Sequence, residues 1–359
     1  MKADHSFPTQ ASDISVGYLS AALKASGFLS TGQIKSVEHT LIGTGKMGDN
    51  ARLSISYQNA PANAPATVIA KLPAADEQAR AMAGAQGAYY NEVMFYRELA
   101  PLSPMKTPDI YASEISEDRS SFLLLMEDMS PAEPGSQLVG ESLVHTQRAL
   151  AEAAKLAASF YGKEEFTNRE YIMTGARDDG GEFGQTLMEQ YWPVFVDRFG
   201  HGLSPEAIAF GERHASNYAH FVSRFQGLKT VAHGDYRSEN ILFSATASTT
   251  VDWQTPCESS ALTDAAYFLG GSVDTTNRRD WERTLIDNYS EQLDANGVTI
   301  SAQDCWEQYR EFSMHGLMIT VLGACFSSAD ERGDRMFLAM IQRHIQQCLD
   351  LDAGEFLPT

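Results

Sequence analysis

Cysteine and basic residues are both scarce in this chain, and each scarcity excludes classes of protein. Four cysteines occur among 359 residues, and no two of them form a C-x-x-C pair. That spacing argues against a zinc site or a disulfide framework and is typical of a protein of the reducing cytoplasm. Lys and Arg number 27 against 47 Asp and Glu, whereas a nucleic-acid partner requires clustered basic side chains. We therefore expect no nucleic-acid binding.

A long hydrophobic run is also missing. The longest apolar stretch, residues 314–326, includes His315 and is too short to cross a bilayer, so it predicts a buried helix. The first nine residues carry Asp, His and Pro where a signal peptide needs an apolar core. We expect a cytoplasmic protein with no membrane partner. The net charge of -20 leaves two interpretations, a well-solvated surface or acidic walls that attract a cationic substrate.

The first third of the chain has the pattern of strands with one helix among them. The pattern between residues 36 and 72 is β-like: apolar Leu53, Ile55 and Tyr57 alternate with polar residues, a turn follows at 61–65, and residues 68–72 form another strand. Residues 76–100 show helical spacing, and residues 121–126 form a continuous apolar run that is typical of a buried strand. Prolines and a glycine in residues 130–135 break regular structure. We place a boundary there, after a β-rich N-lobe at residues 1–129.

The remainder of the chain, residues 130–359, has mostly helical spacing, as in the stretches 142–161 and 305–326. One β-like island interrupts it, where two short strand-like segments at 240–243 and 249–253 flank a polar turn. This pattern predicts a hairpin. We therefore expect an α+β protein of two lobes, in which a β-rich N-lobe precedes a mostly helical C-lobe.

The predicted hairpin carries oxygen-bearing side chains that suit phosphoryl transfer. Asp235 precedes it, Asn240 begins it and Asp252 lies near its end. Transfer from ATP needs a carboxylate to orient and deprotonate the attacking hydroxyl, and hard oxygen ligands to hold Mg²⁺ on the phosphates. Asp235 suits the first task, and Asn240 with Asp252 suits the second. Taken singly, Asp235 and Asn240 are equally typical of ordinary turns, but the spacing of all three indicates a small-molecule kinase.

Three motifs in this region resemble those of the aminoglycoside and choline phosphotransferase superfamily, which has a bilobal protein-kinase-like fold. They are H-G-D-x-R-x-x-N from His233 to Asn240, V-D-W-Q from Val251 to Gln254, and D-A-A-Y-F-L from Asp264 to Leu269. The last two are closer to one branch, which includes the ecdysteroid-kinase-like enzymes and the kinase domains fused to acyl-CoA dehydrogenases. The resemblance extends over residues 36–330.

This resemblance implies a role for each reactive residue of the motifs. Asp235 corresponds to the catalytic base, and Asn240 and Asp252 correspond to magnesium ligands. Arg237, two residues after the base, stands where such kinases place a cation that faces the transferred phosphoryl group. His233 and Asp264 correspond to a histidine and a helix aspartate that support the loop without reacting.

In the predicted N-lobe, Lys71 resembles the kinase lysine that holds the α and β phosphates of ATP. It lies in an otherwise apolar strand, and burying an unpaired ammonium is costly, so it requires an acidic partner. Glu92, in the helix that follows, is the expected partner, with Glu77 and Glu98 as alternatives.

Two further segments of the N-lobe are expected to contact the nucleotide. Gly43 and Gly45 let backbone N–H groups approach a phosphate closely. Their segment lacks the G-x-x-x-x-G-K-[ST] pattern of a Walker loop and is also compatible with a plain hairpin turn. After the apolar strand, Glu127 and Met129 match the hinge at which family members hydrogen-bond adenine through backbone groups.

Two spacings concern the acceptor of the phosphoryl group. More than a hundred residues separate Met129 from Asp235, and the family uses such an insertion to build a small-molecule pocket. Only eleven residues separate Asp252 from Asp264, too few for the activation segment on which protein kinases bind peptides. We expect a small hydroxylated substrate and no protein substrate.

The chemical nature of that substrate has two interpretations. The insertion holds aromatic and methionine side chains that are typical of a core but also suit a pocket for an apolar alcohol, namely Tyr161, Phe166, Tyr171, Met173, Phe183, Met188, Tyr191, Trp192, Phe195 and Phe199. Residues 177–182 are acidic instead, and suit either a solvated loop or a site for an amino sugar or ammonium group. The branch resemblance favours an apolar alcohol or hydroxy-acyl compound.

The leading hypothesis is an ATP- and magnesium-dependent phosphotransferase that acts on an alcohol group, with ATP between the two lobes. One alternative is an antibiotic kinase for aminoglycosides or macrolides. Another is a catalytically silent nucleotide-binding module, although the chain keeps the base, both metal ligands and the lysine that such modules usually lose.

Overall fold

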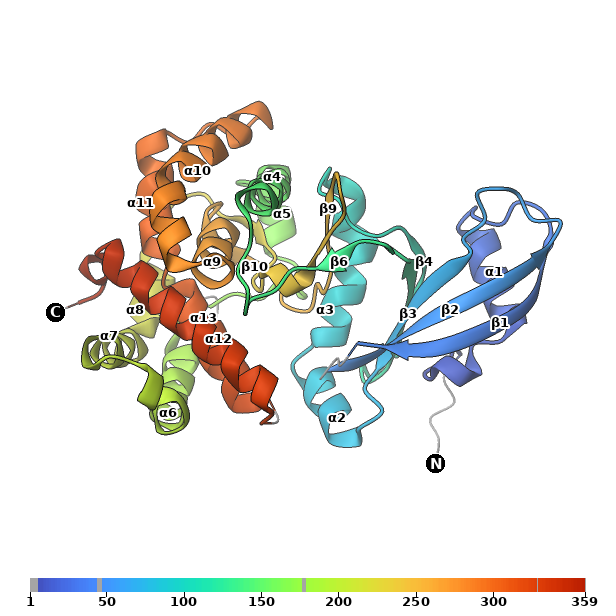
Figure 1. The fold of residues 1–359 in the computed structure, drawn as a ribbon, viewed down its shortest axis with the longest axis horizontal. Helices are drawn as coiled ribbons and strands as arrows, with labels where there is room; N and C mark the ends of the chain where they lie inside the picture. The colour runs from blue at the N-terminus through green and yellow to red at the C-terminus, as the bar shows by residue number, and fades with distance from the viewer. Residues whose placement is uncertain (1–5, 44–46, 176–178, 328, 359) are drawn as a thin grey trace. The chain divides into compact units, whose positions relative to one another are not determined.

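The computed structural model of the chain describes residues 6–43, 47–175, 179–327 and 329–358. The chain forms two compact units (Figure 1). Unit 1 comprises Met1–Leu102, Thr107–Pro131 and Val251–Gln254, and unit 2 comprises Ser103–Lys106, Ala132–Thr250 and Thr255–Thr359. An antiparallel sheet dominates unit 1 and helices dominate unit 2, so the fold is of the predicted α+β class.

The sheet of unit 1 has five antiparallel strands in the order β1-β2-β3-β5-β4. They are β1 (Gln33–Ile42), β2 (Gly48–Gln58), β3 (Thr67–Pro73), β4 (Ile110–Ile115) and β5 (Phe122–Glu127). The central strand β3 pairs Lys71 with Asn50 of β2 and with Leu124 of β5. Because side chains alternate across a strand, Ala70 and Lys71 point to opposite faces of the sheet.

One face of this sheet is covered by helix α1 (Val16–Ala25), which follows a short 3-10 turn at Ala11–Asp13. Leu19 and Leu23 of α1 are fully buried in a core that includes Val68 and other side chains of the sheet. Burying a leucine side chain contributes roughly 1.5–3 kcal/mol to stability. Because this apolar layer fills one side of the sheet, the charged side chain of Lys71 lies on the opposite face of β3.

Residues 76–100, which the sequence pattern predicts as a single helix, form two helices, of which α3 contacts strands β4 and β5. Helix α2 (Glu77–Ala85) ends before Gly87, and α3 (Ala88–Met94) begins after it. Gly87 has a φ of 73°, which is left-handed and strained for residues with a Cβ. The prediction of one continuous helix was wrong because helical spacing of apolar residues continues through this break.

Helix α3 is held against the sheet by aromatic stacking. Tyr89 stacks on Phe122 of β5 with ring centroids 4.4 Å apart. Phe122 and Leu124 lie on one face of β5, so α3 covers the face that carries Lys71. The chain then continues through a π-helical turn at Phe95–Leu99 and a 3-10 turn at Ala100–Leu102.

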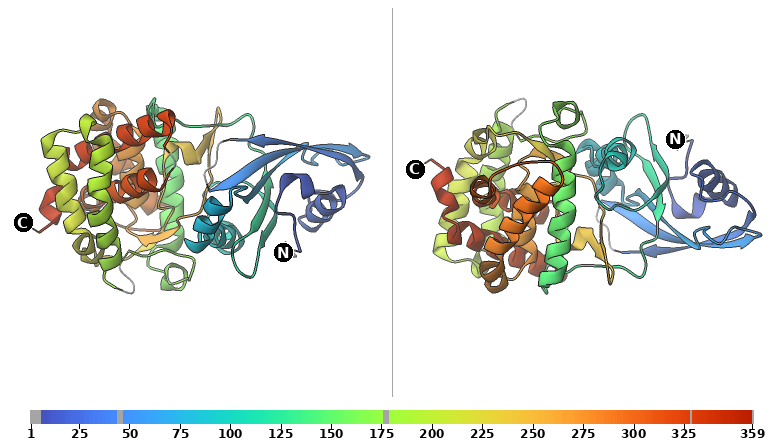
Figure 2. Two further views of the ribbon diagram at one scale, coloured as in Figure 1. Left: turned by 90° about the horizontal axis from the view of Figure 1, so that it is seen from below. Right: turned by 90° about the horizontal axis from the view of Figure 1, so that it is seen from above.

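Unit 2 consists mainly of helices and contains two small sheets of short strands (Figure 2). The helices are α4 (Leu143–Phe160), α5 (Glu164–Thr167), α6 (Glu182–Phe199), α7 (Pro205–Ser216), α8 (Tyr218–Arg224), α9 (Thr263–Ser272), α10 (Thr275–Ala295), α11 (Ala302–Phe312), α12 (His315–Phe326) and α13 (Glu331–Asp350), with 3-10 turns at Gly200–Gly202, Ser238–Asn240 and Ala353–Phe356. Every residue of α9 is buried, which makes it the core helix of the unit. The stretch 305–326, predicted as one helix, divides into α11 and α12.

The predicted hairpin is present in unit 2. Strands β8 (Ile241–Phe243) and β9 (Ser248–Thr250) pair antiparallel, and β6 (Glu133–Pro134) joins the outer side of β8. Strand β7 (Thr230–Ala232), which leads into the H-G-D motif, pairs with β10 (Cys257–Ser259). The chain leaves β9 earlier than the pattern predicts, because Asp252 has a φ of 68° that an extended strand cannot contain.

No helix among the described residues combines the length and the apolar character that crossing a bilayer requires.

His214 of α7 is a buried titratable group in the core of unit 2. It is fully buried, and neither ring nitrogen makes a hydrogen bond with the described residues. The rings of Tyr218 and Phe221 pack around it, with centroids at 5.8 and 5.6 Å. Burial, with a smaller contribution from His315, lowers the pKa of His214 to about 3.

We predict that acid destabilises the protein through this histidine. Below about pH 6.5 the unfolded chain binds a proton at the histidine, whereas the folded chain does not until about pH 3. The unfolded state therefore binds more protons in this window, and the free energy of unfolding falls as the pH falls. In urea unfolding between pH 4.5 and 7.5, His214→Phe should reduce the pH dependence by up to about 1.4 kcal/mol per pH unit.

The matched control is His220→Gln, which replaces an exposed histidine of α8 and should retain the wild-type pH dependence. An unchanged pH dependence in His214→Phe would contradict the prediction.

Candidate active site

The Lys71 ammonium on β3 lies between two carboxylates of unit 1. Its Nζ is 2.8 Å from Oε1 and 2.7 Å from Oε2 of Glu92, and 2.7 Å from Oδ1 of Asp252. Glu92 is fully buried, whereas the Asp252 side chain is 35% exposed. The helix glutamate that contacts Lys71 is thus the expected one, Glu92 of α3. The alternative Glu77 is exposed on α2.

The pKa shifts of this group follow from burial and charge. Burial alone would lower the pKa of Lys71, but the charges of Asp252 and Glu92 outweigh it and raise that pKa. Burial also raises the pKa of Glu92, and the ammonium of Lys71 opposes that shift. Because the ammonium contacts both carboxylates, we conclude that Lys71 is charged. The group therefore presents a fixed cation on β3.

Asp252 is held beside this lysine by the residues that follow it. The Trp253 indole is fully buried and stacks on the Phe95 ring, with centroids 3.5 Å apart and planes 7° apart. Nδ2 of Asn91 donates a hydrogen bond to the Gln254 carbonyl at 3.2 Å. The left-handed backbone of Asp252 costs a residue with a Cβ about 1–3 kcal/mol. Packing on α3 and the ion pair with Lys71 compensate for that cost.

The glycines predicted to approach a phosphate lie at the end of β1. Gly43 has a φ of 74°, and a Cβ placed there would meet no atom of the described residues within 4 Å. The backbone of Gly43 is thus accessible and takes a conformation that favours glycine. Gly45 lies outside the described residues, so its part in the prediction stays untested.

The predicted hinge follows β5. The Glu127 backbone N–H donates to the Asp109 carbonyl at 2.8 Å, whereas the half-buried Met129 makes no backbone hydrogen bond with the described residues. Between them, Asp128 accepts from Nε and Nη2 of Arg52 at 2.6 and 3.1 Å. Partial burial raises the pKa of Asp128, but these hydrogen bonds outweigh it and lower the pKa. Of the two predicted hinge residues, Met129 is therefore the one whose backbone N–H is not used within the described ranges.

In unit 2, the Asp235 carboxylate accepts hydrogen bonds on both of its oxygens. Oδ1 accepts from the Tyr267 hydroxyl at 2.7 Å. Oδ2 accepts from Nδ2 of Asn240 at 3.0 Å and from Nε of Arg237 at 3.2 Å. The Asp235 side chain remains 24% exposed. A carboxylate that is oriented by several donors and still accessible can act as a general base toward a bound hydroxyl.

Asn240 and Arg237 have further contacts that define their orientation. Nδ2 of Asn240 also donates to the Asp235 carbonyl at 2.8 Å. This arrangement leaves Oδ1 of Asn240 without a hydrogen bond from the described residues, so it presents a hard oxygen of the kind that Mg²⁺ prefers. Nη1 of Arg237 lies 2.8 Å from Oε2 of Glu239. Burial would lower the pKa of Arg237, but Asp235 and other neighbours raise it, so the guanidinium is charged.

Buried residues hold the backbone of this loop. The Asp264 carboxylate at the start of α9 accepts from the backbone N–H groups of His233 and Gly234, at 2.7 and 3.1 Å. Nδ1 of the fully buried His233 accepts from the Asp235 N–H at 3.3 Å. Gly234 has a φ of 83°, and a Cβ there would lie 2.3 Å from the Thr255 carbonyl oxygen. The loop can therefore contain only glycine at this position.

Three residues that contact the loop were absent from the sequence prediction. Tyr267 reaches Asp235, Nε2 of His315 lies 2.8 Å from the Gly234 carbonyl, and Oε1 of Gln137 accepts from the Ser238 hydroxyl at 2.9 Å. Tyr267 was predictable, because it follows the helix aspartate by three residues and shares its face of α9. The other two come from distant parts of the chain, and no local pattern indicates them.

The described residues contain no cluster of three or more His, Cys, Asp or Glu that could hold a metal ion. Mg²⁺ that arrives with nucleotide phosphates is typically held by one or two protein ligands and not by a complete protein cage. Asn240 in unit 2 and Asp252 in unit 1 are each suited to that more limited role.

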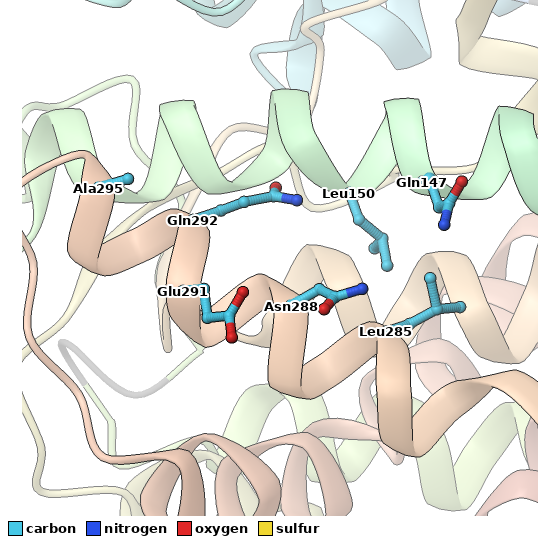
Figure 3. A pocket seen from close by; sticks show the side chains of 7 residues that line it. All are labelled: Gln147, Leu150, Leu285, Asn288, Glu291, Gln292 and Ala295. Carbon is cyan, nitrogen blue, oxygen red and sulfur yellow. The ribbon is translucent and has the colours of Figure 1, made fainter.

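A pocket of about 430 Å³ lies between α4 and α10 in unit 2 (Figure 3). Its walls combine apolar side chains with amides and one carboxylate, namely Gln147, Leu150, Leu285, Asn288, Glu291, Gln292 and Ala295. None of the predicted site residues lines it, so we do not assign the phosphoryl transfer to this pocket.

The model of the ecdysteroid kinase-like family matches residues 46–300, more than half of the chain. A search of the curated proteins gave no match.

Solved structures with a similar fold include two kinds of small-molecule kinase. The choline kinase from Cryptosporidium parvum Iowa II aligns with a TM-score of 0.54 and 13% identity, over 90% of this chain and 92% of that one. A putative aminoglycoside phosphotransferase from Ralstonia eutropha JMP134 aligns with a TM-score of 0.52 and 13% identity, over 94% and 99%. The GDP complex of wild-type aminoglycoside 2'-phosphotransferase-IIIa aligns with a TM-score of 0.52 and 12% identity, over 90% and 94%. At these identities the likeness shows a kinase-like fold.

We predict that the buried ion pair of Lys71 makes a large contribution to stability. Glu92→Gln keeps the shape of the side chain but removes the charge that compensates the buried ammonium. The free energy of unfolding, measured in urea, should fall by about 1.5–3 kcal/mol, the range for hydrogen bonds to charged groups.

The control is Glu77→Gln, the same substitution on the exposed surface of α2, which should change stability by at most about 0.5 kcal/mol. Equal stabilities of the two variants would contradict the pairing.

Proposed function

Since this chain belongs to the ecdysteroid kinase-like family, we propose that it is an ATP-dependent phosphotransferase whose acceptor is a hydroxyl group of a small molecule. The observation that carries this proposal is the Asp235 carboxylate, oriented on both oxygens and still accessible. The fold shared with a choline kinase and with aminoglycoside phosphotransferases supports it.

In the proposed reaction, Asp235 orients the acceptor hydroxyl and takes its proton as the oxygen attacks the γ-phosphorus. Phosphoryl transfer depends on positioning and charge stabilisation more than on covalent chemistry of the protein. Arg237 is the candidate cation for the transferred group, because its charge lies next to the base. General base catalysis of this kind contributes about 10²–10⁴-fold to a rate.

In unit 1, we assign Lys71 to the phosphates of the nucleotide, with Glu92 holding the ammonium in place. The accessible backbone of Gly43 is a second candidate phosphate contact. The N–H of Met129, which donates to no backbone group in the described part of the chain, is the candidate contact for adenine. The GDP complex of the aminoglycoside 2'-phosphotransferase-IIIa supports a purine nucleotide as donor. The activity assay described below therefore compares GTP with ATP as the phosphoryl donor.

Magnesium would arrive with the nucleotide and neutralise charge on its phosphates. We assign Asn240 and Asp252 as its protein ligands. The Asn240 amide is turned so that its oxygen, and not its nitrogen, is available. The Asp252 carboxylate contacts Lys71 through Oδ1, and the side chain is partly exposed. Both are oxygen donors of the type that fits this ion.

For the acceptor, we propose an apolar alcohol or hydroxy-acyl compound. Many apolar side chains of the insertion belong to the core, but Met173 and Phe183 are 47% and 69% exposed. Met173 forms a bridge to Cys257 of β10, which pairs with the strand leading into the H-G-D motif. The carboxylate of Asp179 instead accepts the N–H groups of Gly181 and Phe183, both at 2.8 Å. It thus caps α6, which argues against Asp179 as a ligand for a cation. Residues 177 and 178 of the acidic stretch lie outside the described residues.

We predict that Asp235→Asn abolishes transfer but spares nucleotide binding. The amide cannot accept the proton of the acceptor, so kcat should fall by about 10²–10⁴-fold. The Kd for MgATP should change by less than threefold. The assay follows magnesium-dependent consumption of ATP or GTP with a fatty alcohol, a hydroxysteroid, a hydroxy-acyl ester, choline, ethanolamine or kanamycin as acceptor.

The control is Asp280→Asn, which removes the same charge from an exposed site on α10 and should have wild-type activity. Activity of Asp235→Asn within tenfold of wild type would contradict its role as base. Turnover of kanamycin alone would favour the antibiotic kinase, and inactivity of the wild type with every acceptor would favour the silent nucleotide-binding module.

A further inference from the structure

Tyr267 contacts the proposed base from the interior of unit 2. Its side chain is 1% exposed and lies on α9, the helix in which every residue is buried. The hydroxyl donates a 2.7 Å hydrogen bond to Oδ1 of Asp235. A buried ring on a core helix has little freedom to move, so its hydroxyl is a fixed reference point for the carboxylate.

Two histidines from other helices fix the plane of the Tyr267 ring. The His344 ring of α13 is stacked on it, with centroids 5.1 Å apart and planes 6° apart. The His315 ring of α12 meets it edge-on, at 5.6 Å and 86°. His315 also contacts the Gly234 carbonyl through Nε2 at 2.8 Å. His315 therefore contacts both the Tyr267 ring and the loop that carries Asp235.

The His344 ring occupies a space that only glycines can provide. A Cβ on Gly270, Gly271 or Gly316 would lie within 2.5, 2.7 or 2.2 Å of the ring, respectively. The three glycines come from α9 and α12, so the imidazole of α13 is enclosed at the junction of three helices. A small shift of this ring would force the backbone of a neighbouring helix to move, and its position is therefore rigid.

The hydrogen bonds on Asp235 distinguish its two oxygens. Oδ2 accepts from both Asn240 and Arg237, whereas Oδ1 accepts from Tyr267. Each carboxylate oxygen has about two lone-pair sites. A third donor therefore fits better on Oδ1, next to the tyrosine hydroxyl.

We propose that Tyr267 is the positioning residue of the base, and that Oδ1 of Asp235 receives the proton of the acceptor hydroxyl. This inference rests on the proposed function. The acceptor oxygen forms its bond to the γ-phosphorus while the bond from that phosphorus to the bridging oxygen breaks. ADP leaves with the electron pair, and the hydroxyl proton moves to Oδ1.

The protonation states of the three rings are consistent with this role. Burial raises the pKa of Tyr267 well above its ordinary value, so the phenol stays a hydrogen-bond donor at neutral pH. Burial lowers the pKa of His344 to about 3, and it lowers the pKa of His315 as well. Both imidazoles are therefore neutral aromatic neighbours of the tyrosine.

The test removes one oxygen atom. Tyr267→Phe keeps the ring between the two histidines and deletes the hydroxyl that contacts Asp235. The matched control is Tyr289→Phe in α10, which deletes another buried hydroxyl, one that donates to the Ala261 carbonyl at 2.8 Å. Urea unfolding checks that both variants are folded. Kinetics use the acceptor that the wild type phosphorylates fastest, and crystal structures of both variants without acceptor report the Asp235 side chain.

For Tyr267→Phe we expect kcat to fall about 10- to 100-fold, as for a reacting group displaced by about 1 Å. The KM for ATP should stay within threefold of wild type, and the Asp235 carboxylate should adopt a different or a mixed rotamer. Tyr289→Phe should keep kcat within twofold, with Asp235 unmoved. These results together support the positioning role, because lost stability alone would affect both variants alike.

A Tyr267→Phe variant with kcat within threefold of wild type and an unmoved Asp235 would overturn the inference. If Asp235→Asn is inactive in the same assay, only the role of Tyr267 fails and the proposed function stands. If Asp235→Asn is active, the proposed function fails, and the crystal structures still decide whether Tyr267 positions the carboxylate.

Discussion

The hydrogen bonds that hold Asp235 are the constraint on which the proposed chemistry depends. One buried helix, α9, supplies two of the supports: Asp264 binds the backbone of the loop, and Tyr267 binds the Asp235 side chain. Backbone and side chain are thus placed relative to the same rigid element. Catalytic groups need such preorganisation, because displacements of about 1 Å can cost 10²-fold in rate. The helices around α9, including the one that carries His344, keep that element in place.

In unit 1, the equivalent constraint is the ion pair of Lys71. A charged lysine on a buried strand face requires compensation, and Glu92 and Asp252 provide it from elements that are far apart in the sequence. The segment Val251–Gln254 packs with unit 1 although the chain on either side of it belongs to unit 2. Stacking of Trp253 on Phe95 accounts for this placement.

The sequence predicts those features that depend on residues close together in the chain or on the periodicity of apolar residues within one element. The α+β class and the hairpin that follows Asp235 were predictable from periodicity. The cost of burying an ammonium predicted an acidic partner for Lys71, with Glu92 as the expected one, but it did not indicate the second partner, Asp252. The helix break at Gly87 was not predictable, because the helical spacing of apolar residues continues through it. Only the positive φ of Gly87 in the structure reveals the break. The contact of His315 with the loop was not predictable either, since it depends on how helices distant in sequence pack. Tyr267 belongs to the D-A-A-Y-F-L motif, and its spacing of three residues from Asp264 indicates that both side chains lie on one face of a helix.

The central claim, that Asp235 is the base for an acceptor hydroxyl, is tested most directly by a crystal structure with Mg²⁺, a non-hydrolysable ATP analogue and an acceptor that is a substrate. We predict an acceptor oxygen at hydrogen-bonding distance, about 2.6–3.2 Å, from Oδ1 of Asp235. We also expect this oxygen to point at the γ-phosphorus. An acceptor hydroxyl bound to a different carboxylate, with Asp235 facing only water, would contradict the central claim.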